Sequence, residues 1–341
     1  MKVSIIGASG YVGAELLRII SKHPEVELIY ATSRQYNGKF ISEIHSNLNS
    51  IINMKFSNDN PQTIAQKSDV VFTSTPHTAA MKLILELVES DVKIVDMSGD
   101  FRFTNHKDYE TWYETNHIAE ELNEKFVYGL PELHRTQIKK ASYVANPGCY
   151  PTSAILALYP LMKSSSLDFD RIIVDAKSGT SGAGANPKQF TLHAECDGTI
   201  KPYNPLKHRH IGEMEQELSK IANRSIKIGF TPHLIPITRG ILSSCYVFYQ
   251  NAEDFTNMYK EAYSNEYFVR FIGENVPELK SVIGSNFVDV GIITDKRVNR
   301  IIAFSAIDNL VKGAAGQAVQ NFNIMCNFEE KTAIDQIALN P

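Results

Sequence analysis

The first 145 residues alternate between short apolar runs and amphipathic segments. Residues 2–6 form an apolar run that ends at Gly7, a helical pattern follows and stops near His23-Pro24, and Val26–Ala31 has the composition of a second strand. A strand, a helix and a strand in about 30 residues predict a right-handed βαβ unit, which implies a parallel sheet.

The same alternation continues along this part of the chain. Further strands are predicted at Asp69–Ser74, Lys93–Asp96 and Ser142–Ala145, with an amphipathic helix at residues 78–90. We therefore expect a Rossmann-type α/β domain with a doubly wound parallel sheet.

The pattern changes after Cys149. A helix is predicted at Pro151–Leu161, strands at Arg171–Lys177, Ile226–Phe230, Gly240–Tyr249, Asn286–Thr294 and Arg300–Ala306, and an Ala- and Gln-rich helix at Gly313–Asn323. Long strands with few helices predict an α+β second domain with a large mixed or antiparallel sheet. We expect a dinucleotide-binding domain at 1–148 with a returning C-terminal helix at 310–341, and a second domain at 149–309.

Composition narrows the class of protein. A chain of 341 residues is long for one core, which favours two domains, and its net charge of -4 gives no field that would attract nucleic acid or an anionic membrane. No apolar run approaches the roughly 20 residues of a membrane span, and the N-terminus is not of the secretory type. The four cysteines form no CxxC pair, so we expect no metal site and a reducing, cytoplasmic environment.

A glycine-rich turn follows the first predicted strand. The segment reads Gly7-Ala8-Ser9-Gly10-Tyr11-Val12-Gly13, in a GxxGxxG spacing. Glycines here permit a tight turn and a close approach to phosphate, and the N-terminus of the following helix attracts anions. We expect Gly7, Ser9, Gly10, Tyr11, Val12 and Gly13 to bind the cofactor; the alternative is a βα turn with no ligand.

The end of the second predicted strand bears on the choice of cofactor. An NAD enzyme carries a carboxylate there for the ribose, whereas this chain has Thr32-Ser33-Arg34. Hydroxyl and guanidinium groups suit a 2′-phosphate, so Ser33 and Arg34 favour NADP. An ordinary loop cation at Arg34 is the alternative.

Cys149 is the candidate nucleophile. It lies in Asn146-Pro147-Gly148-Cys149-Tyr150-Pro151-Thr152, after a strand and at the head of a helix with proline in its first turn. The positive end of the helix dipole would lower the pKa of the thiol there. A buried structural cysteine is the alternative, as Cys245 is expected to be within its apolar run.

A histidine-rich segment offers a proton carrier for the thiol. His208-Arg209-His210-Ile211-Gly212-Glu213 places His210 and Glu213 three residues apart on one helix face, where Glu213 could orient an imidazole. We expect His208, His210 and Glu213 to take part in catalysis as a group, and the spacing does not say which histidine moves the proton. A solvated helix start is the alternative.

Other candidate ligands are scattered along the chain. The loop Ser178–Gly184 offers amide and hydroxyl donors for an anion, with Ser178, Gly179 and Gly182 as expected cofactor residues, or it is a flexible loop. Arg102 and Arg239 are candidate cations for a substrate carboxylate or phosphate. Asn309 could bind the nicotinamide carboxamide, or its segment could serve only in helix packing.

Together these segments resemble the N-acetyl-gamma-glutamyl-phosphate reductases of arginine biosynthesis, over nearly the whole chain. The most specific match is Asn146–Thr152, and one departure is Ser153, where that family more often has Ala or Gly. The resemblance implies that Cys149 attacks an acyl phosphate, that NADPH reduces the thioester, and that a semialdehyde leaves. It also implies a cytoplasmic homo-oligomer, a dimer or tetramer, that assembles through the second domain.

Several other functions remain open. Aspartate-semialdehyde dehydrogenase shares this chemistry but differs in its cysteine motif, and a reductase of a carrier-linked aminoadipyl phosphate belongs to the same broad family. A thiol hydrolase would have no use for Gly7–Gly13, and a non-catalytic NADP-binding sensor would not need Cys149.

Overall fold

The computed structural model describes residues 1–340, which form two compact units. The first unit contains Met1–Pro147 and Ala314–Asp335, and the second contains Gly148–Gly313 and the residues from Gln336. The returning segment of the first unit is therefore shorter at both ends than the range 310–341 expected from the sequence.

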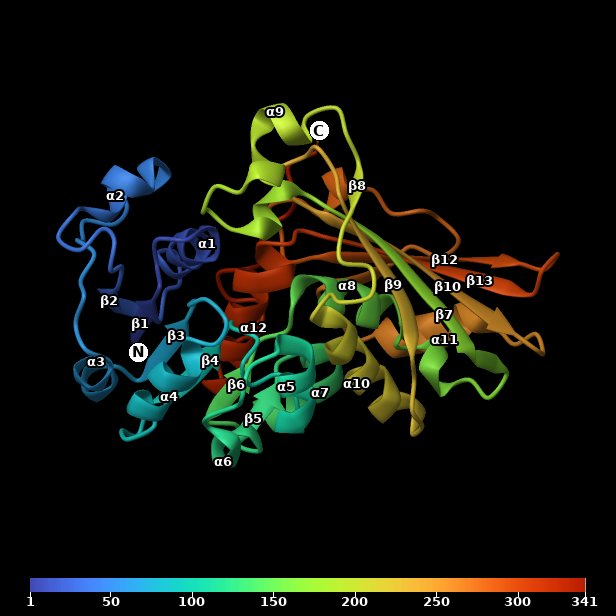
Figure 1. The fold of residues 1–341 in the computed structure, drawn as a ribbon, viewed down its shortest axis with the longest axis horizontal. Helices are drawn as coiled ribbons and strands as arrows, with labels where there is room; N and C mark the ends of the chain where they lie inside the picture. Colours follow the sequence, from blue (N-terminus) through green and yellow to red (C-terminus); the bar gives the residue numbers. More distant parts are fainter. Residues whose placement is uncertain (341) are drawn as a thin grey trace. The chain divides into compact units, whose positions relative to one another are not determined.

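The first unit is built on a six-stranded parallel sheet with the order β2-β1-β3-β4-β6-β5 (Figure 1). Its strands are β1 (Lys2–Ile6), β2 (Glu27–Ala31), β3 (Val70–Thr73), β4 (Lys93–Asp96), β5 (Phe126–Tyr128) and β6 (Tyr143–Ala145). Its helices are α1 (Tyr11–Ile20), α2 (Ile41–Ile44), α3 (Pro61–Lys67), α4 (Ala80–Leu87), α5 (His106–Tyr113), α6 (Glu120–Asn123), α7 (Pro131–Ile138) and α12 (Gly316–Met325). Because β2 and β3 flank β1 on opposite sides, the chain reverses its direction of winding at the carboxyl end of β1, where such sheets bind ligands.

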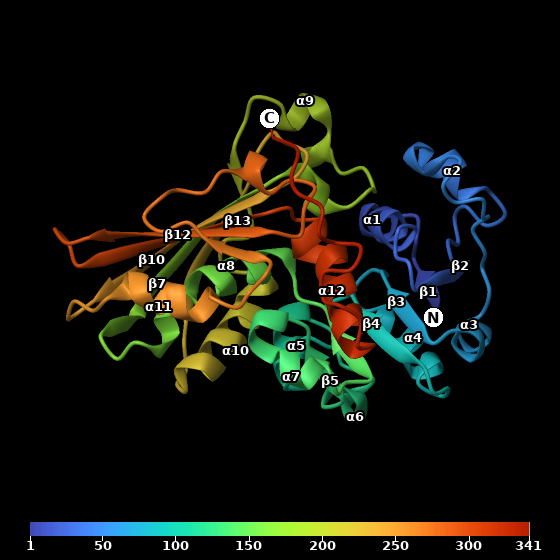
Figure 2. The ribbon, with the colours of Figure 1, turned by 180° about the vertical axis from the view of Figure 1, so that it is seen from behind.

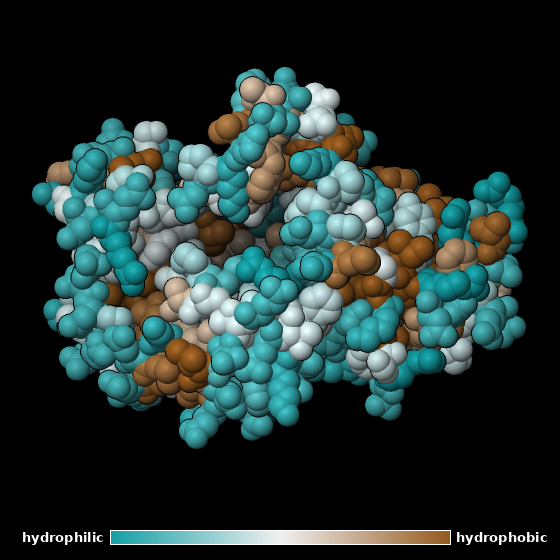
Figure 3. All heavy atoms as spheres, viewed as in Figure 1, coloured by the Kyte–Doolittle hydropathy of each residue, from teal (hydrophilic) through white to brown (hydrophobic). Residues whose placement is uncertain are grey.

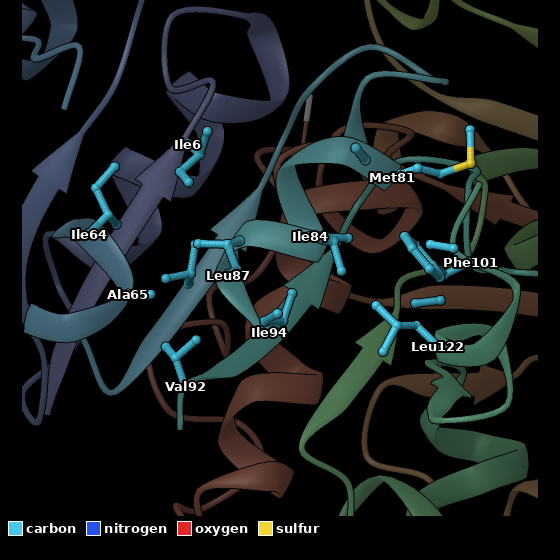
Figure 4. Close-up of a cluster of buried hydrophobic side chains, with 14 of the residues drawn as sticks. Ile6, Ile64, Ala65, Met81, Ile84, Leu87, Val92, Ile94, Phe101 and Leu122 are labelled. Carbon is cyan, nitrogen blue, oxygen red and sulfur yellow. The ribbon is translucent and has the colours of Figure 1, made fainter. Parts of the chain in front are cut away.

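Helices cover both faces of this sheet. On one face, Met81, Ile84 and Leu87 of α4 pack on Ile94 of β4 in a buried apolar cluster (Figure 4). On the other face, Phe72 of β3 contacts Phe322 of α12 with 5.6 Å between the ring centroids. Two covered faces are why nearly every residue of β1, β3 and β4 is buried.

The second unit is built on a seven-stranded mixed sheet with the order β11-β12-β13-β10-β7-β9-β8 (Figure 2). Its strands are β7 (Leu167–Ser178), β8 (Lys201–Pro202), β9 (Ile228–Leu234), β10 (Ile241–Tyr249), β11 (Val269–Phe271), β12 (Val288–Asp295) and β13 (Arg300–Ile307). Its helices are α8 (Cys149–Leu158), α9 (His193–Cys196), α10 (His210–Ala222) and α11 (Phe255–Tyr263). The β7–β9 and β11–β12 pairs are parallel, and the other pairs are antiparallel.

The two faces of this second sheet differ. Alternate residues such as Cys245 and Ala303 are buried on the face that packs on α8. Their neighbours point to the opposite face, where Tyr246 pairs with Ile173 on one side and with Ile302 on the other. Ile173 is 44% exposed, and hydrophobic surface gathers over the strands of this unit (Figure 3). The centre of the opposite face is therefore apolar and, in the single chain, only partly covered, and ion pairs such as Lys177–Asp175 and Arg300–Asp295 lie beside it on the same face.

The expected fold class is confirmed, with differences in detail. Every strand expected from the sequence is present, and α8 begins at Cys149 rather than at Pro151. The short strands β5, β8 and β11 were missed because two or three residues carry too little periodicity to recognise. None of the helices in residues 1–340 combines the length and apolar character needed to cross a bilayer.

Candidate active site

The glycine-rich turn connects β1 to α1 in the first unit. Gly7 has a φ of +86°, and a Cβ at Gly7 would lie 2.3 Å from the carbonyl oxygen of Ser74, so only glycine fits there. Gly10 is the N-cap of the ten-residue α1, and a Cβ on it would meet nothing within 4 Å. Backbone N–H groups of Tyr11 and Val12 in the first helical turn have no intrahelical acceptor. This uncrowded helix start fits the phosphates of a dinucleotide.

The turn is tied to the end of β2. The Ser33 hydroxyl donates to Ser9 Oγ at 2.9 Å, and the amide of Gly7 donates to Thr32 Oγ1 at 3.2 Å. Arg34 is exposed, and no carboxylate lies in Thr32–Arg34. The structure thus joins Ser33 to Ser9 of the glycine-rich turn, and Arg34 is the next residue in the chain.

Arg102 also belongs to the first unit and is only 6% exposed. Its Nε donates to the carbonyl oxygen of Asn146 at 2.8 Å, and its Nη2 donates to that of Met97 at 3.1 Å. These carbonyls follow β6 and β4, so Arg102 joins two adjacent strand ends at the carboxyl edge of the sheet. A role in binding substrate stays a prediction.

Cys149 is the first helical residue of α8, with Gly148 as the N-cap. The residue is half-buried, and Pro151 lies in the first turn as the sequence predicts. A Cβ on Gly313 would be 2.8 Å from Cys149 Cβ, so the backbone at Gly313 packs directly against the cysteine. The sulfur-bearing residue is therefore fixed at the positive end of a helix dipole.

Two residues of the histidine-rich segment contact the turn before Cys149. Glu213, 1% exposed, accepts a hydrogen bond from the amide of Gly148 at 2.7 Å. A Cβ on Gly148 would lie 2.5 Å from His210 Nε2, so this imidazole packs against the N-cap of α8. The Glu213 carboxylate thus holds the turn before Cys149, and the orientation of an imidazole by Glu213 stays a prediction.

His208 has a different environment. Burial, together with the charge of Arg209, lowers the pKa of His208 to about 4, so its imidazole is neutral near pH 7. The amide of His210 donates to His208 Nδ1 at 3.2 Å, which leaves the ring proton on Nε2. The ring packs edge to face on Tyr150 and Phe230. The His208 imidazole thus holds the start of α10 through the hydrogen bond from the His210 amide.

The loop at Ser178–Gly184 and the remaining candidates also lie in the second unit. Asn309 Oδ1 accepts from the amide of Gly240 at 2.7 Å, and its Nδ2 donates to Ser181 Oγ at 2.9 Å. Arg239 Nη1 lies 3.4 Å from Asp308 Oδ2. The structure thus joins the loop, Arg239 and Asn309 in one network, while Gly182 is exposed at the loop's surface. Binding of a nicotinamide carboxamide by Asn309 stays a prediction.

Three residues of this region were not recognised from the sequence. Tyr150 and Tyr203 join their hydroxyls at 2.9 Å, and Asp308 accepts from the amides of Leu310 and Gly284 besides its contact with Arg239. Tyr150 could have been suspected from its position next to the cysteine. Tyr203 lies in a short loop with no periodicity, so only the fold reveals its neighbours.

The four cysteines form no disulfide. Among residues 1–340, no group of three or more His, Cys, Asp or Glu side chains is arranged to hold a metal ion.

Two family models match the chain. The model described as semialdehyde dehydrogenase, NAD binding domain, matches residues 2–141, and that described as semialdehyde dehydrogenase, dimerisation domain, matches residues 149–309. Solved structures of similar fold include aspartate semialdehyde dehydrogenase II from Vibrio cholerae, with a TM-score of 0.72 at 18% identity over 96% of this chain and 98% of that one. An aspartate semialdehyde dehydrogenase with NADP from Candida albicans gives a TM-score of 0.70 at 17% identity over 95% and 98%.

Curated relatives match at much higher identity. The N-acetyl-gamma-glutamyl-phosphate reductase of Thermoanaerobacter pseudethanolicus is 48% identical and that of Moorella thermoacetica 45%, each over 100% of both chains. A putative [LysW]-L-2-aminoadipate/[LysW]-L-glutamate phosphate reductase of Nitrosopumilus maritimus is 42% identical, also over 100% of both.

Proposed function

The chain belongs to the family of N-acetyl-gamma-glutamyl-phosphate reductases, and from that premise we propose that it reduces N-acetyl-gamma-glutamyl phosphate to N-acetylglutamate semialdehyde and phosphate in arginine biosynthesis. The observation that carries the proposal is the position of Cys149 as first residue of α8, with His210 packed against the preceding Gly148. A thiolate at a helix N-terminus beside an imidazole is the arrangement that covalent acyl transfer needs.

The reaction begins at Cys149. Its thiolate attacks the acyl phosphate carbonyl, a carbon–sulfur bond forms, and the bond to phosphate breaks, which gives a thioester and inorganic phosphate. A nicotinamide cofactor, when bound, supplies the hydride that reduces the acyl group. The thiohemiacetal on Cys149 then collapses, the carbon–sulfur bond breaks, and the aldehyde leaves.

We assign the proton transfers to His210 rather than to His208. His210 lies against the N-cap residue adjacent to Cys149, within the region where the thiol and the oxyanion change protonation. His208 is neutral near pH 7, and its Nδ1 is occupied by the amide of His210. His208 and Glu213 are thus positioning residues, one for α10 and one for the turn before Cys149.

The NAD binding domain identifies a nicotinamide dinucleotide as the cofactor. Gly7–Gly13 would hold its phosphates, because Gly10 leaves open space at the start of α1. We propose NADP rather than NAD, since Ser33 and Arg34 offer a hydroxyl and a cation where a carboxylate would repel a 2′-phosphate. In the second unit, Arg239 would bind an anionic group of the substrate.

We also propose that the protein is a homo-oligomer that pairs through the apolar face of the second sheet. The dimerisation domain spans the strands that form this face, and Tyr246, Ile302 and Ile173 lie side by side on it. An apolar sheet face of this kind is stabilised when a second copy removes it from water.

The test is the reverse reaction with purified protein. We expect phosphate-dependent reduction of NADP with N-acetylglutamate semialdehyde, and loss of turnover in Cys149→Ser while NADP still binds. Near-normal turnover in that variant would rule out the thioester. Aspartate semialdehyde is the comparison substrate, and no reaction with it is expected, since that enzyme class matches at the level of fold alone.

A second candidate substrate follows from the Nitrosopumilus relative. Its full-length identity of 42% is close to that of the other relatives, so a carrier-linked aminoadipyl or glutamyl phosphate has to be compared directly. Reaction with the carrier-linked semialdehyde, and not with the N-acetylated one, would favour this candidate.

A further inference from the structure

The Asp308 carboxylate joins three segments of the second unit at the end of β13. Asp308 is fully buried, and its Oδ1 accepts from the amides of Leu310 at 2.8 Å and Val311 at 3.2 Å. Its Oδ2 accepts from the amide of Gly284 at 2.7 Å and from Arg239 Nη1 at 3.4 Å. Both oxygens of the buried carboxylate are therefore bound, which offsets the cost of burying the charge, and one partner is a cation.

The backbone beside Arg239 is held by the residue after Asp308. Asn309 Oδ1 accepts from the amide of Gly240 at 2.7 Å, and Gly240 has a φ of +112°. The Gly240 carbonyl oxygen in turn accepts from the amide of Gly179 at 2.9 Å. Two adjacent residues thus hold this segment, one at its backbone and one at the Arg239 guanidinium. The Arg239 side chain is still 31% exposed, so a dissolved anion can reach it.

The main chain of Asp308 leads to the nucleophile. Its carbonyl oxygen accepts from the amide of Gly313 at 2.9 Å. Gly313 is the glycine on which a Cβ would lie 2.8 Å from Cys149 Cβ. Asp308 therefore bonds through its side chain to the candidate ligand-binding cation Arg239, and through its backbone to the residue that packs on Cys149.

We propose that Asp308 is a positioning residue of the Cys149 site, whose carboxylate holds the Arg239 guanidinium in place for an anionic group of the substrate. The inference rests on the proposed function, in which Arg239 binds that group. A guanidinium is a planar fork of N–H donors, and it binds a carboxylate or phosphate best when the fork has the right orientation. Holding the fork before the substrate arrives lowers the cost of immobilising a long side chain on binding.

The test compares Asp308→Asn with Arg239→Gln in the full-length protein, in the reverse reaction with phosphate and N-acetylglutamate semialdehyde. The asparagine oxygen can still accept from the Leu310 amide, whereas the asparagine nitrogen cannot accept from Arg239. The KM for one of the two substrates should increase about tenfold in both variants, with kcat changed by no more than about twofold. The substrate whose KM increases carries the anionic group that Arg239 binds.

A double variant tests whether Asp308 acts through Arg239. With both changes, this KM should equal that of Arg239→Gln within about twofold, because the two changes remove one contact. Glu215→Gln is the matched control, since Glu215 is also buried, accepts from the Ile228 amide at 3.1 Å and pairs with Lys227 at 2.7 Å. It should leave both KM values unchanged. Additive effects, a lower KM in Asp308→Asn, or an equal increase in Glu215→Gln would overturn the inference.

A further variant, Arg239→Lys, does not depend on the folding of Asp308→Asn. Lysine keeps the charge but lacks the fork, so the KM should increase about as much as in Arg239→Gln. A wild-type KM would show that charge alone is sufficient, which would contradict a role for Asp308 in holding the guanidinium.

A crystal structure of Asp308→Asn gives a readout that does not need turnover. The Arg239 guanidinium should occupy more than one position in this variant, and a single position unchanged from the wild type would contradict the inference. Failure of the proposed function would show instead as a wild-type protein that is inactive with the N-acetylated and the carrier-linked semialdehyde, while Arg239 is still displaced in Asp308→Asn.

Discussion

Arg34 is the residue on which the choice between NADP and NAD depends. It is exposed at the end of β2, next to Ser33, which is bonded to Ser9 of the glycine-rich turn. Arg34→Ala should weaken NADP binding about tenfold or more, since a charge-assisted contact to the 2′-phosphate is lost, and leave NAD binding unchanged. Lys39→Ala, which removes another exposed cation of the same region, is the control. Equal weakening of both cofactors in Arg34→Ala would contradict the assignment, and titration by fluorescence measures both constants.

His208 predicts a pH dependence of stability. An unfolded imidazole titrates near 6.5 and the folded one near 4, so the folded state binds the proton less readily. The contribution of neutral His208 is therefore complete above about pH 6.5 and is lost as the pH falls toward 4, up to about 3 kcal/mol. His208→Asn keeps an acceptor for the His210 amide and removes the titration.

The free energy of unfolding, from urea titrations at pH 7 and pH 5, checks this prediction. The wild type should lose more stability than His208→Asn over that range. Burial also lowers the pKa of His23, His45 and His117, but these residues are present in both proteins and cancel in the comparison. Two parallel stability curves would mean that folding does not lower the pKa of His208.

Ser153 connects the nucleophile's helix to the sheet beneath it. Its hydroxyl lies 2.7 Å from Ser243 Oγ of β10 and 2.5 Å from Ser305 Oγ of β13, and Ser305 also donates to the Ser153 carbonyl at 2.7 Å. All three are fully buried. The departure from the family at this position thus supplies a hydroxyl that two strands share.

Removing that hydroxyl should be costly at the level of the element. In Ser153→Ala, the hydroxyls of Ser243 and Ser305 lose a partner inside the protein, which costs about 1–3 kcal/mol of stability. The further change Ser243→Ala should then cost little, because the partner was already lost. Thermal unfolding of the single and double variants measures this coupling, and simple additivity would show that the three hydroxyls act independently.

Helices and strands were predictable where they are long enough to show a pattern of apolar residues. The strands β1, β3, β4, β10, β12 and β13 were recognised because each spans at least four residues and has apolar residues in its centre, and α8 was recognised from Pro151 and the apolar residues after it. The helix and the strand between Ser178 and His210 were not predicted from the sequence. These elements, α9 and β8, are too short to show a periodic pattern of apolar residues, and β8 forms by pairing with β9.

Site residues were predictable when they belong to a motif of neighbouring residues in the sequence. Gly7–Gly13 has a regular glycine spacing, and Cys149 lies in a Pro-Gly turn before a predicted helix. The hydrogen bond from the Gly148 amide to Glu213 and that from Tyr203 to Tyr150 join residues more than 50 positions apart. No local pattern encodes such pairs, because the fold alone brings them together.

At the scale of the whole molecule, the sheet of the second unit predicts self-association. Ile302 lies in the centre of the apolar face, beside Tyr246 on β10 and Ile293 on β12. Ile302→Lys places a charge where pairing of two copies would remove it from water, and an unpaired charge in an interface is strongly unfavourable. We expect the wild type to be a dimer or larger and this variant to be a monomer at micromolar concentration, as measured by light scattering after size exclusion.

A second lysine substitution separates pairing from a general effect of charge. Ile51 is 61% exposed in the first unit, so Ile51→Lys should leave the oligomer intact. The far-ultraviolet circular dichroism of Ile302→Lys should match that of the wild type, because Ile302 is only half-buried in the single chain. An Ile302→Lys protein that keeps its fold and still runs as the wild-type oligomer would place the interface on another surface. The apolar side chains on this sheet face would then need a different partner to cover them.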